Sequence, residues 1–358
     1  MTQKLKKTPL AARCEQAGGK MVDFHGWLMP VQFAGILAEH KAVREHAGMF
    51  DVSHMGQIFV EGLNAWPFLQ YINCNNIKNG PAEGTYSHIL TEKGTIIDDA
   101  ISFCLAPEQF LVVVNAACID EDFAWMKKQA KKFNVTVRNE SSKWGMIAVQ
   151  GPEAVDIVNK LLPGVADLPR FHISPLTMFE VDGYVTRTGY TGEDGVEIML
   201  PADKIGLLWD TLLQCGVVPC GLGARDVLRL EAGYLLNGAD ADQTRTPYEA
   251  NCGWVVKLAK ENFIGKDILA AQKAAGLKEK LTAFVLTSPG VPRTGCKVFV
   301  GDKEKGTLTS GTYSPLFKGI AVGYADTDLT VGQDVEIEIH GKRAKAQVVK
   351  TPFYKNRV

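Results

Sequence analysis

Two adjacent aspartates, Asp98 and Asp99, lie between two apolar segments typical of β-strands, 96–97 and 100–105. In an extended chain neighbouring side chains point to opposite faces, so we expect one carboxylate to face the interior and the other to face away. A carboxylate near a reacting molecule can accept or donate a proton, which makes the pair a candidate for acid–base chemistry. A turn or surface position is the alternative, because a glycine at position 94 precedes the pair, and the residues alone slightly favour it.

A second candidate site centres on Glu197, in the segment Gly195-Val-Glu-Ile-Met-Leu. It follows Arg187-Thr-Gly-Tyr-Thr-Gly-Glu-Asp, whose glycines permit tight turns and the close approach of a ligand to the backbone. Arg225 opens an amphipathic helix after Gly221-Leu-Gly-Ala. From the residues alone the simpler interpretation stays open for both, an exposed strand glutamate and a surface arginine in a cap or salt bridge.

The common signatures of several enzyme classes are missing from the sequence. There is no Walker loop, no Gly-x-Ser-x-Gly elbow, no His-Glu-x-x-His and no Gly-x-Gly-x-x-Gly after a strand. The seven histidines lack metal-ligand spacing, and the eight cysteines form no Cys-x-x-Cys pair. We therefore predict a metal-free protein whose cysteines are free thiols in a reducing compartment, the cytoplasm.

Length and charge restrict the classes of partner. The chain has 358 residues, which predicts two or three domains. Its 39 Lys and Arg against 40 Asp and Glu leave a net charge of -1, without the basic excess of a phosphate-binding surface. No apolar run approaches the length of a membrane span. Neither nucleic acid nor a membrane is therefore expected as a partner.

Helical and strand-like segments are mixed along the chain without the regular spacing of βαβ units. Apolar periodicity predicts helices at 35–47, 120–133, 153–162, 203–214 and 225–236. After residue 281, five short strands separated by turn residues predict a small β-barrel, preceded by a helix and linker at 266–280. The fold class that these patterns predict is α+β with antiparallel sheets.

Six motifs occur in order along the chain and together point to one family. They are Phe50-Asp-Val-Ser-His-Met-Gly, Ile96-Ile-Asp-Asp, Val114-Asn-Ala-Ala, Arg187-Thr-Gly-Tyr-Thr-Gly-Glu, Gly221-Leu-Gly-Ala-Arg-Asp and Thr309-Ser-Gly-Thr-Tyr-Ser-Pro. The set closely resembles the aminomethyltransferase (T-protein) family of the glycine cleavage system. One such motif would be weak, whereas six in register from about residue 8 to 354 are highly specific. Departures are small: Gly94-Thr95, for example, stands where the family commonly has Gly-Gly.

This resemblance implies a three-domain cloverleaf with a central opening. Domain 1 is expected to be discontinuous, at 1–55 and 142–240. Domain 2 is expected to be inserted at 56–141, with 241–280 as a helix and linker. The C-terminal β-barrel, domain 3, is expected at 281–358.

The resemblance also implies a reaction and its participants. A lipoylated H-protein presents an aminomethyl group, whose methylene is transferred to tetrahydrofolate with release of ammonia. The second aspartate of the Ile-Asp-Asp motif is the key acidic residue of the family, and here it is Asp99. The folate contacts that carry over are Met55, Tyr86, Asn115, Tyr190, Glu197, Arg225 and Trp254, with Tyr354 and Arg357 as expected contacts of the glutamate tail.

Two other functions remain open because relatives with the same scaffold perform them. One is a folate-dependent demethylase that acts on a sulfonium substrate. Asp98-Asp99 and the Arg187-Thr-Gly-Tyr-Thr-Gly-Glu run argue against it. The other is a folate-binding protein without transferase activity, which is expected to carry its own cysteine motif and to lack the double aspartate.

Overall fold

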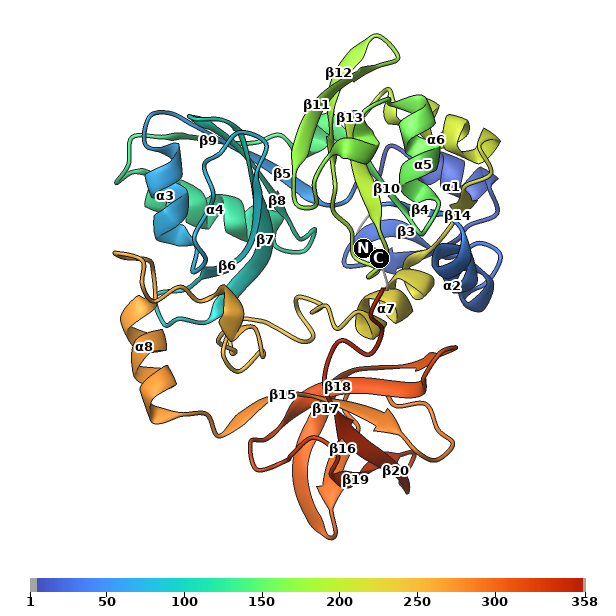
Figure 1. Ribbon diagram of the computed structural model, residues 1–358, viewed down its shortest axis with the longest axis vertical. Helices are drawn as coiled ribbons and strands as arrows, with labels where there is room; N and C mark the ends of the chain where they lie inside the picture. The colour runs from blue at the N-terminus through green and yellow to red at the C-terminus, as the bar shows by residue number, and fades with distance from the viewer. Residues whose placement is uncertain (1–4, 357–358) are drawn as a thin grey trace.

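The computed structural model describes residues 5–356 and has three lobes, each built around a β-sheet (Figure 1). A five-stranded sheet lies at the upper left of Figure 1, a six-stranded sheet at the upper right and a closed barrel at the bottom. Helix α7 (Leu222–Glu231) lies between the six-stranded sheet and the barrel. Helices and mostly antiparallel sheets are mixed, which confirms the predicted α+β class.

The six-stranded sheet is covered on one face by three helices. Its order is β11 (Ile173–Met178), β12 (Val181–Thr186), β13 (Gly195–Pro201), β10 (Trp144–Gln150), β4 (Gly48–Asp51) and β14 (Val218–Pro219). The helices are α1 (Ala11–Gln16), α5 (Ala154–Leu161) and α6 (Ile205–Gln214). Val158 and Trp209 from these helices share a buried cluster with Ile147 and Ile198 from the central strands. Removing these apolar faces from water stabilises the lobe.

The five-stranded sheet has one face covered by helices and one face turned toward the six-stranded sheet. Its order is β6 (Gly84–Leu90), β7 (Ile96–Ala106), β8 (Gln109–Val114), β5 (Gly56–Glu61) and β9 (Thr136–Asn139). Helices α3 (Ala65–Ile72) and α4 (Ile119–Ala130) pack on the first face, where Phe68 and Met126 join Ile58 and Val112. On the second face Phe103 shares a cluster with Met146 and Met199 of the other sheet, so the two lobes meet through apolar contact.

The C-terminal lobe is a closed six-stranded barrel, as the sequence predicts. Around the barrel the strands are β15 (Glu279–Leu286), β18 (Lys318–Asp326), β17 (Lys303–Ser314), β16 (Lys297–Val300), β19 (Asp334–Ile339) and β20 (Lys342–Val349). Helix α8 (Lys266–Ala275) precedes them. The sequence misses β17, because this strand is rich in Thr, Ser, Lys and Gly and lacks a clear apolar alternation.

The remaining elements of the described chain are a small sheet, one helix and three 3-10 turns. A three-stranded sheet is formed by β1 (Lys6–Lys7), β3 (Trp27–Gln32) and β2 (Lys20–Phe24). Helix α2 (Ile36–Glu45) and the 3-10 turns Ser141–Lys143, Val165–Asp167 and Gly253–Val255 complete the set. Between residues 5 and 356, no helix has the length and apolar character needed to span a bilayer.

Two local expectations are wrong. The turn considered for Asp98 and Asp99 does not form, because both belong to the continuous strand β7. The helix expected at 225–236 starts earlier and ends at Glu231. Gly233 follows with a φ of +73°, a left-handed conformation that commonly terminates helices.

Helix α7 joins the barrel through buried charges. Arg229 is 1% exposed and donates to Asp240 Oδ2 at 2.5 Å and to Ser310 Oγ of β17 at 2.8 Å. Glu231, also buried, accepts hydrogen bonds from Arg44 of α2 and from Ser314 of β17. The position of the barrel against α7 therefore depends on paired charges that have no access to water.

We expect Arg229→Met to lower the free energy of unfolding by about 3–5 kcal/mol, because it leaves Asp240 buried without its cation. Denaturant titration measures this change, with Arg13→Met at the exposed pair with Asp210 as the control, expected to cost less than about 1 kcal/mol. The double variant Arg229→Met/Asp240→Leu should recover part of the loss. Equal destabilisation by the Arg13 and Arg229 variants would contradict the importance of the buried pair.

Candidate active site

Asp98 and Asp99 point to opposite faces of β7, as their adjacency predicts. Asp98 is fully buried on the face that α4 covers. Asp99 is half-buried and shares the other face with Ile101 and Phe103, two and four residues along the strand. This second face is the one that meets the six-stranded sheet.

Asn115, directly after β8, connects the two aspartates. Its Nδ2 donates to Asp98 Oδ1 at 2.8 Å and to Asp99 Oδ1 at 3.0 Å. Its backbone N–H donates to Asp98 Oδ2 at 2.9 Å. Because one amide group contacts both carboxylates, the side chain of Asp99 is held in place from behind the strand.

Tyr86 holds the other oxygen of Asp99. Its hydroxyl donates to Asp99 Oδ2 at 3.1 Å and lies 3.3 Å from Nε2 of His88. Burial lowers the pKa of His88 to about 3, so this imidazole is neutral and its Nε2–H can donate to the tyrosine. The ring of Tyr86 stacks on Trp254, with 5.7 Å between ring centroids and an interplanar angle of 18°.

Asp99 has the proton affinity of a general base that works near neutral pH. Burial and, as a smaller effect, the negative charge of Asp98 together raise the pKa of Asp99 to about 7. The hydrogen bonds from Tyr86 and Asn115 favour the charged form and limit the rise. A carboxylate of this kind can accept a proton at neutral pH and return it.

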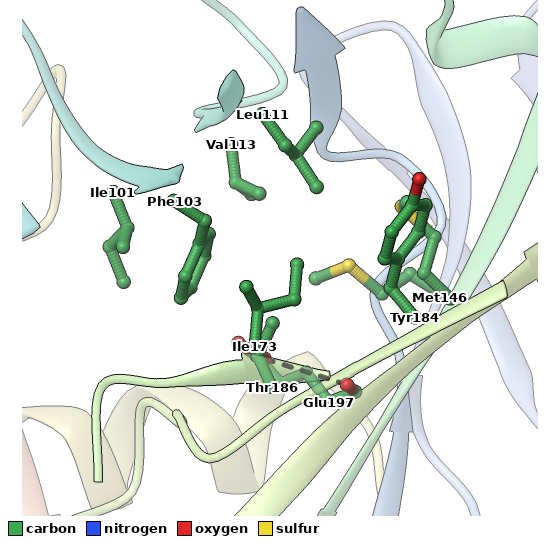
Figure 2. A pocket seen from close by; sticks show the side chains of 10 residues that line it. Ile101, Phe103, Leu111, Val113, Met146, Ile173, Tyr184, Thr186 and Glu197 are labelled. Carbon is green, nitrogen blue, oxygen red and sulfur yellow. Dashed lines mark hydrogen bonds between the residues drawn. The ribbon is translucent and has the colours of Figure 1, made fainter. Parts of the chain in front are cut away.

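Glu197 lies across from this strand, on β13. Thr188 donates to its Oε2, whereas within residues 5–356 no donor lies at its Oε1. Burial raises the pKa of Glu197. The carboxylate borders a narrow cavity of about 20 Å³, room for one water, whose other lining is mostly apolar and includes Ile101 and Phe103 of β7 (Figure 2).

Arg225 is the cation beside Glu197. Its guanidinium lies over the ring of Tyr190, 4.7 Å from the ring centroid. No acceptor in the described part of the chain is within hydrogen-bond distance of it, and burial lowers the pKa of this arginine. A half-buried guanidinium without an acceptor is unusual and is available to bind a ligand.

The two groups of residues belong to one site. Ile101 shares a strand face with Asp99 and lines the same cavity as Glu197. The charge of Asp99 also acts on Tyr190, whose pKa is raised mainly by burial. The arrangement combines a base, an unsatisfied carboxylate oxygen, an unsatisfied guanidinium and aromatic rings, which suits a planar polar ligand that undergoes proton transfer.

Comparison with known proteins identifies the family. The model of the GCVT N-terminal domain matches residues 10–260, and that of the glycine cleavage T-protein C-terminal barrel domain matches residues 279–355. The chain belongs to the glycine cleavage T-protein family.

Full-length relatives of this family are aminomethyltransferases. Those of Pseudothermotoga lettingae and Lysinibacillus sphaericus are 42% and 43% identical, and each alignment covers 99% of both chains. The crystal structure of the glycine cleavage system aminomethyltransferase T from Bartonella henselae superimposes with a TM-score of 0.93, at 34% identity and 99% coverage of both chains. Family membership therefore extends over both the sequence and the three-lobed fold.

The other residues expected from the T-protein family lie in different surroundings. Met55 is partly buried and packs against the apolar cluster between the sheets. Trp254 is 60% exposed, which leaves part of its surface free. Tyr354 lies over the Arg44 guanidinium at 3.9 Å, and its backbone N–H donates to the Glu231 carbonyl. Arg357 lies outside the described residues.

Sequence reasoning missed several residues that shape the site. His88 and Thr188 position Tyr86 and Glu197 respectively. Asn237 Nδ2 donates to Asp98 Oδ1 at 2.9 Å from a segment 139 residues away. Strand alternation could have pointed to His88, which lies two residues after Tyr86, but no local pattern marks Asn237.

Asp98, Cys118 and Asp122 form one group that could hold a metal, with candidate ligand atoms within 4.8 Å of one another. All three are buried on the helix-covered side of β7, the face opposite to Asp99. Asp98 already accepts three N–H donors there.

Tyr86→Phe should raise the pKa of Asp99 above its value of about 7, by up to about one pH unit. The reason is that the lost hydroxyl donates to the charged form, and removing it disfavours that form. Carboxyl ¹³C NMR titration measures the pKa, with the signal assigned through Asp99→Asn. The control is Tyr234→Phe, because the ring of Tyr234 stacks on Tyr190, with 5.8 Å between the ring centroids. An unchanged or lower pKa in Tyr86→Phe would exclude this hydrogen bond.

Proposed function

We propose that the chain is a tetrahydrofolate-dependent aminomethyltransferase of glycine degradation. The substrate is the aminomethyl group carried on the sulfur of the lipoyl arm of an H-protein. The methylene is transferred to tetrahydrofolate, ammonia is released, and the products are 5,10-methylenetetrahydrofolate and dihydrolipoyl H-protein. Family membership over the full length supports this class of reaction.

The single observation that carries the folate assignment is the pair of unsatisfied charged groups at Glu197 and Arg225. Glu197 Oε1 and the Arg225 guanidinium both lack a hydrogen-bond partner among residues 5–356, and both side chains are half-buried. A half-buried charge without a protein partner is unusual, so this pair supports a ligand that supplies the missing hydrogen bonds.

A pterin ring fits these groups. It presents an exocyclic amine and a ring N–H side by side, which one carboxylate can accept together, and Glu197 is the candidate. Arg225 can donate to an acceptor on the same ring. Tyr190, Tyr86 and Trp254 provide aromatic surface against which flat rings can pack.

Asp99 is proposed to be the acid–base group of the transfer. Folate supplies the nitrogen nucleophile that receives the methylene. Ionised Asp99, held by Tyr86 and Asn115, is suited to hydrogen-bond a reacting N–H and to accept its proton. Holding the lipoyl arm and folate together should add much of the rate, because a bound pair avoids the entropy of encounter.

We also propose the domain boundaries expected from the sequence, with 56–141 inserted between 1–55 and 142–240. Strands β4 and β10 are hydrogen-bonded neighbours although about 90 residues separate them. The strands between them, β5 to β9, form the separate five-stranded sheet. This topology supports an insertion that interrupts one sheet and builds another.

Glu197→Gln should weaken tetrahydrofolate binding by about 2–4 kcal/mol. The amide replaces one acceptor oxygen with a donor, which removes a charge-assisted bond and opposes a pterin donor. Titration calorimetry with the purified protein measures the affinity. Glu180→Gln, at the exposed turn between β11 and β12, is the matched control. Unchanged affinity in Glu197→Gln would place the pterin elsewhere.

Asp99→Asn should lower turnover at least about a hundredfold while folate affinity changes little, because shape is kept but the proton acceptor is lost. The assay is tetrahydrofolate-dependent ammonia release from aminomethylated H-protein, with exposed Asp203→Asn as the control. Wild-type activity in this assay also separates the transferase from a demethylase or a non-catalytic folate binder. A fully active Asp99→Asn enzyme would refute the role of Asp99 and leave the reaction class standing.

A further inference from the structure

Asp98 is a second buried carboxylate directly behind Asp99, and it has its own set of donors. The Asn115 backbone N–H contacts Oδ2 at 2.9 Å, while the side-chain amides of Asn115 and Asn237 contact Oδ1 at 2.8 and 2.9 Å. Three N–H donors stabilise the ionised form of a carboxylate. These hydrogen bonds therefore favour the ionised form of Asp98.

Asp122, in the first turn of α4, is the opposite case. It is fully buried, and neither of its oxygens has a donor within residues 5–356. Its carboxyl lies against Asp98, with the candidate ligand atoms of the two residues and of Cys118 all within 4.8 Å of one another. A buried ionised carboxylate without a donor is strongly disfavoured.

Electrostatics decides how the two carboxyl groups share charge. The groups around Asp98 and Asp122 are the amides of Asn115 and Asn237, the thiol of Cys118 and the carboxylates of Asp99 and Glu121. No cation of the described chain lies within hydrogen-bond distance of the two carboxyl groups. Two adjacent carboxylates in such a place cannot both ionise, so the pair retains one proton. Since Asp98 has the N–H donors, the proton belongs on Asp122.

We propose that Asp122 is a neutral carboxylic acid that donates a hydrogen bond to ionised Asp98, and that this pair is a positioning device for Asp99. Asp98 in turn orients the Asn115 amide that contacts Asp99. One fixed negative charge then lies behind Asp99 and increases its affinity for a proton. Burial and the charge of Asp98 raise the pKa of Asp122 well above the usual range, which agrees with this assignment.

The pair has a defined consequence for Asp99. The charge of Asp98 contributes to raising the pKa of Asp99 to about 7, after burial. If Asp122 were ionised as well, the lobe would hold a second unpaired negative charge. With the proton on Asp122, Asp99 keeps one negative neighbour and remains a base that is mostly ionised at pH 8.

The charge location can be tested with Asp122→Asn and Asp98→Asn. Asp122→Asn replaces a neutral donor by a neutral donor, so the pKa of Asp99 should stay within about 0.3 units of wild type. Asp98→Asn removes the charge and should lower the pKa of Asp99 by about one unit or more. Carboxyl ¹³C NMR titration reads both values, with exposed Asp120→Asn of the same helix turn as the matched control.

Infrared spectroscopy tests the proton directly and does not depend on the proposed function. Wild-type protein at pH 8 should show the carbonyl stretch of a protonated carboxyl, which Asp122→Asn removes and Asp120→Asn leaves unchanged. This arm also decides the question if Asp98→Asn fails to fold. Absence of the band in wild type, or its persistence in Asp122→Asn, would overturn the proposal.

A turnover measurement tests the positioning role and rests on the proposed function. Asp122→Leu removes the donor and should lower kcat about tenfold or more, with the KM for tetrahydrofolate within about twofold, whereas Asp122→Asn should restore kcat. Equal kcat losses in the Leu and Asn variants would contradict positioning through a hydrogen bond. A stoichiometric metal in wild type that is lost in Asp122→Asn would replace the proton by an ion and refute the proposal. Inactive wild-type protein with an intact infrared band would refute the transferase alone.

Discussion

Helix α7 carries several charged side chains, and the arrangement of the lobes depends on how those charges are paired. Arg229 and Glu231 are buried against the barrel and α2, and both find partners there. Arg225, one turn before Arg229, faces the candidate site and finds no acceptor. A rotation or shift of α7 would therefore break the barrel contact and move the site arginine together. The buried ion pairs couple the placement of the C-terminal barrel to the geometry of the site.

Burial without pairing is the second feature of the site. Glu197 has a raised pKa and Arg225 a lowered one, each mainly because partial burial disfavours its charged form. In a purely structural network these two groups would bond each other or a neighbour. Here Thr188 and the ring of Tyr190 support them but leave bonding positions open. A ligand that fills these positions offsets a desolvation cost that folding has already met, which favours binding of a molecule with matching donors and acceptors.

Local features of the fold are predicted from the sequence more accurately than features that depend on long-range pairing. Segments with a clear period were predicted correctly, such as the helix near 154–161 and the strand 335–339, because burial of one face imposes the period. The sequence does not predict strand β17, because seven of its twelve residues are Ser, Thr or Gly. The turn considered at Asp98 was wrong because the pairing of β7 with β6 and β8 outweighs the local tendency of Gly94 and the aspartates to form a turn.

The sequence alone determined the family, the α+β class and the barrel, and it offered opposite orientations of Asp98 and Asp99 as one of two interpretations. These follow from motifs and from the two-residue period of an extended chain, which need no knowledge of distant residues. Only the tertiary structure decided that Asn115 links both aspartates, that Asn237 reaches Asp98 and that Asp122 lies behind them without a donor. Proton affinity and hydrogen bonding depend on neighbours within a few ångströms, and chain folding brings those neighbours from positions up to 139 residues apart.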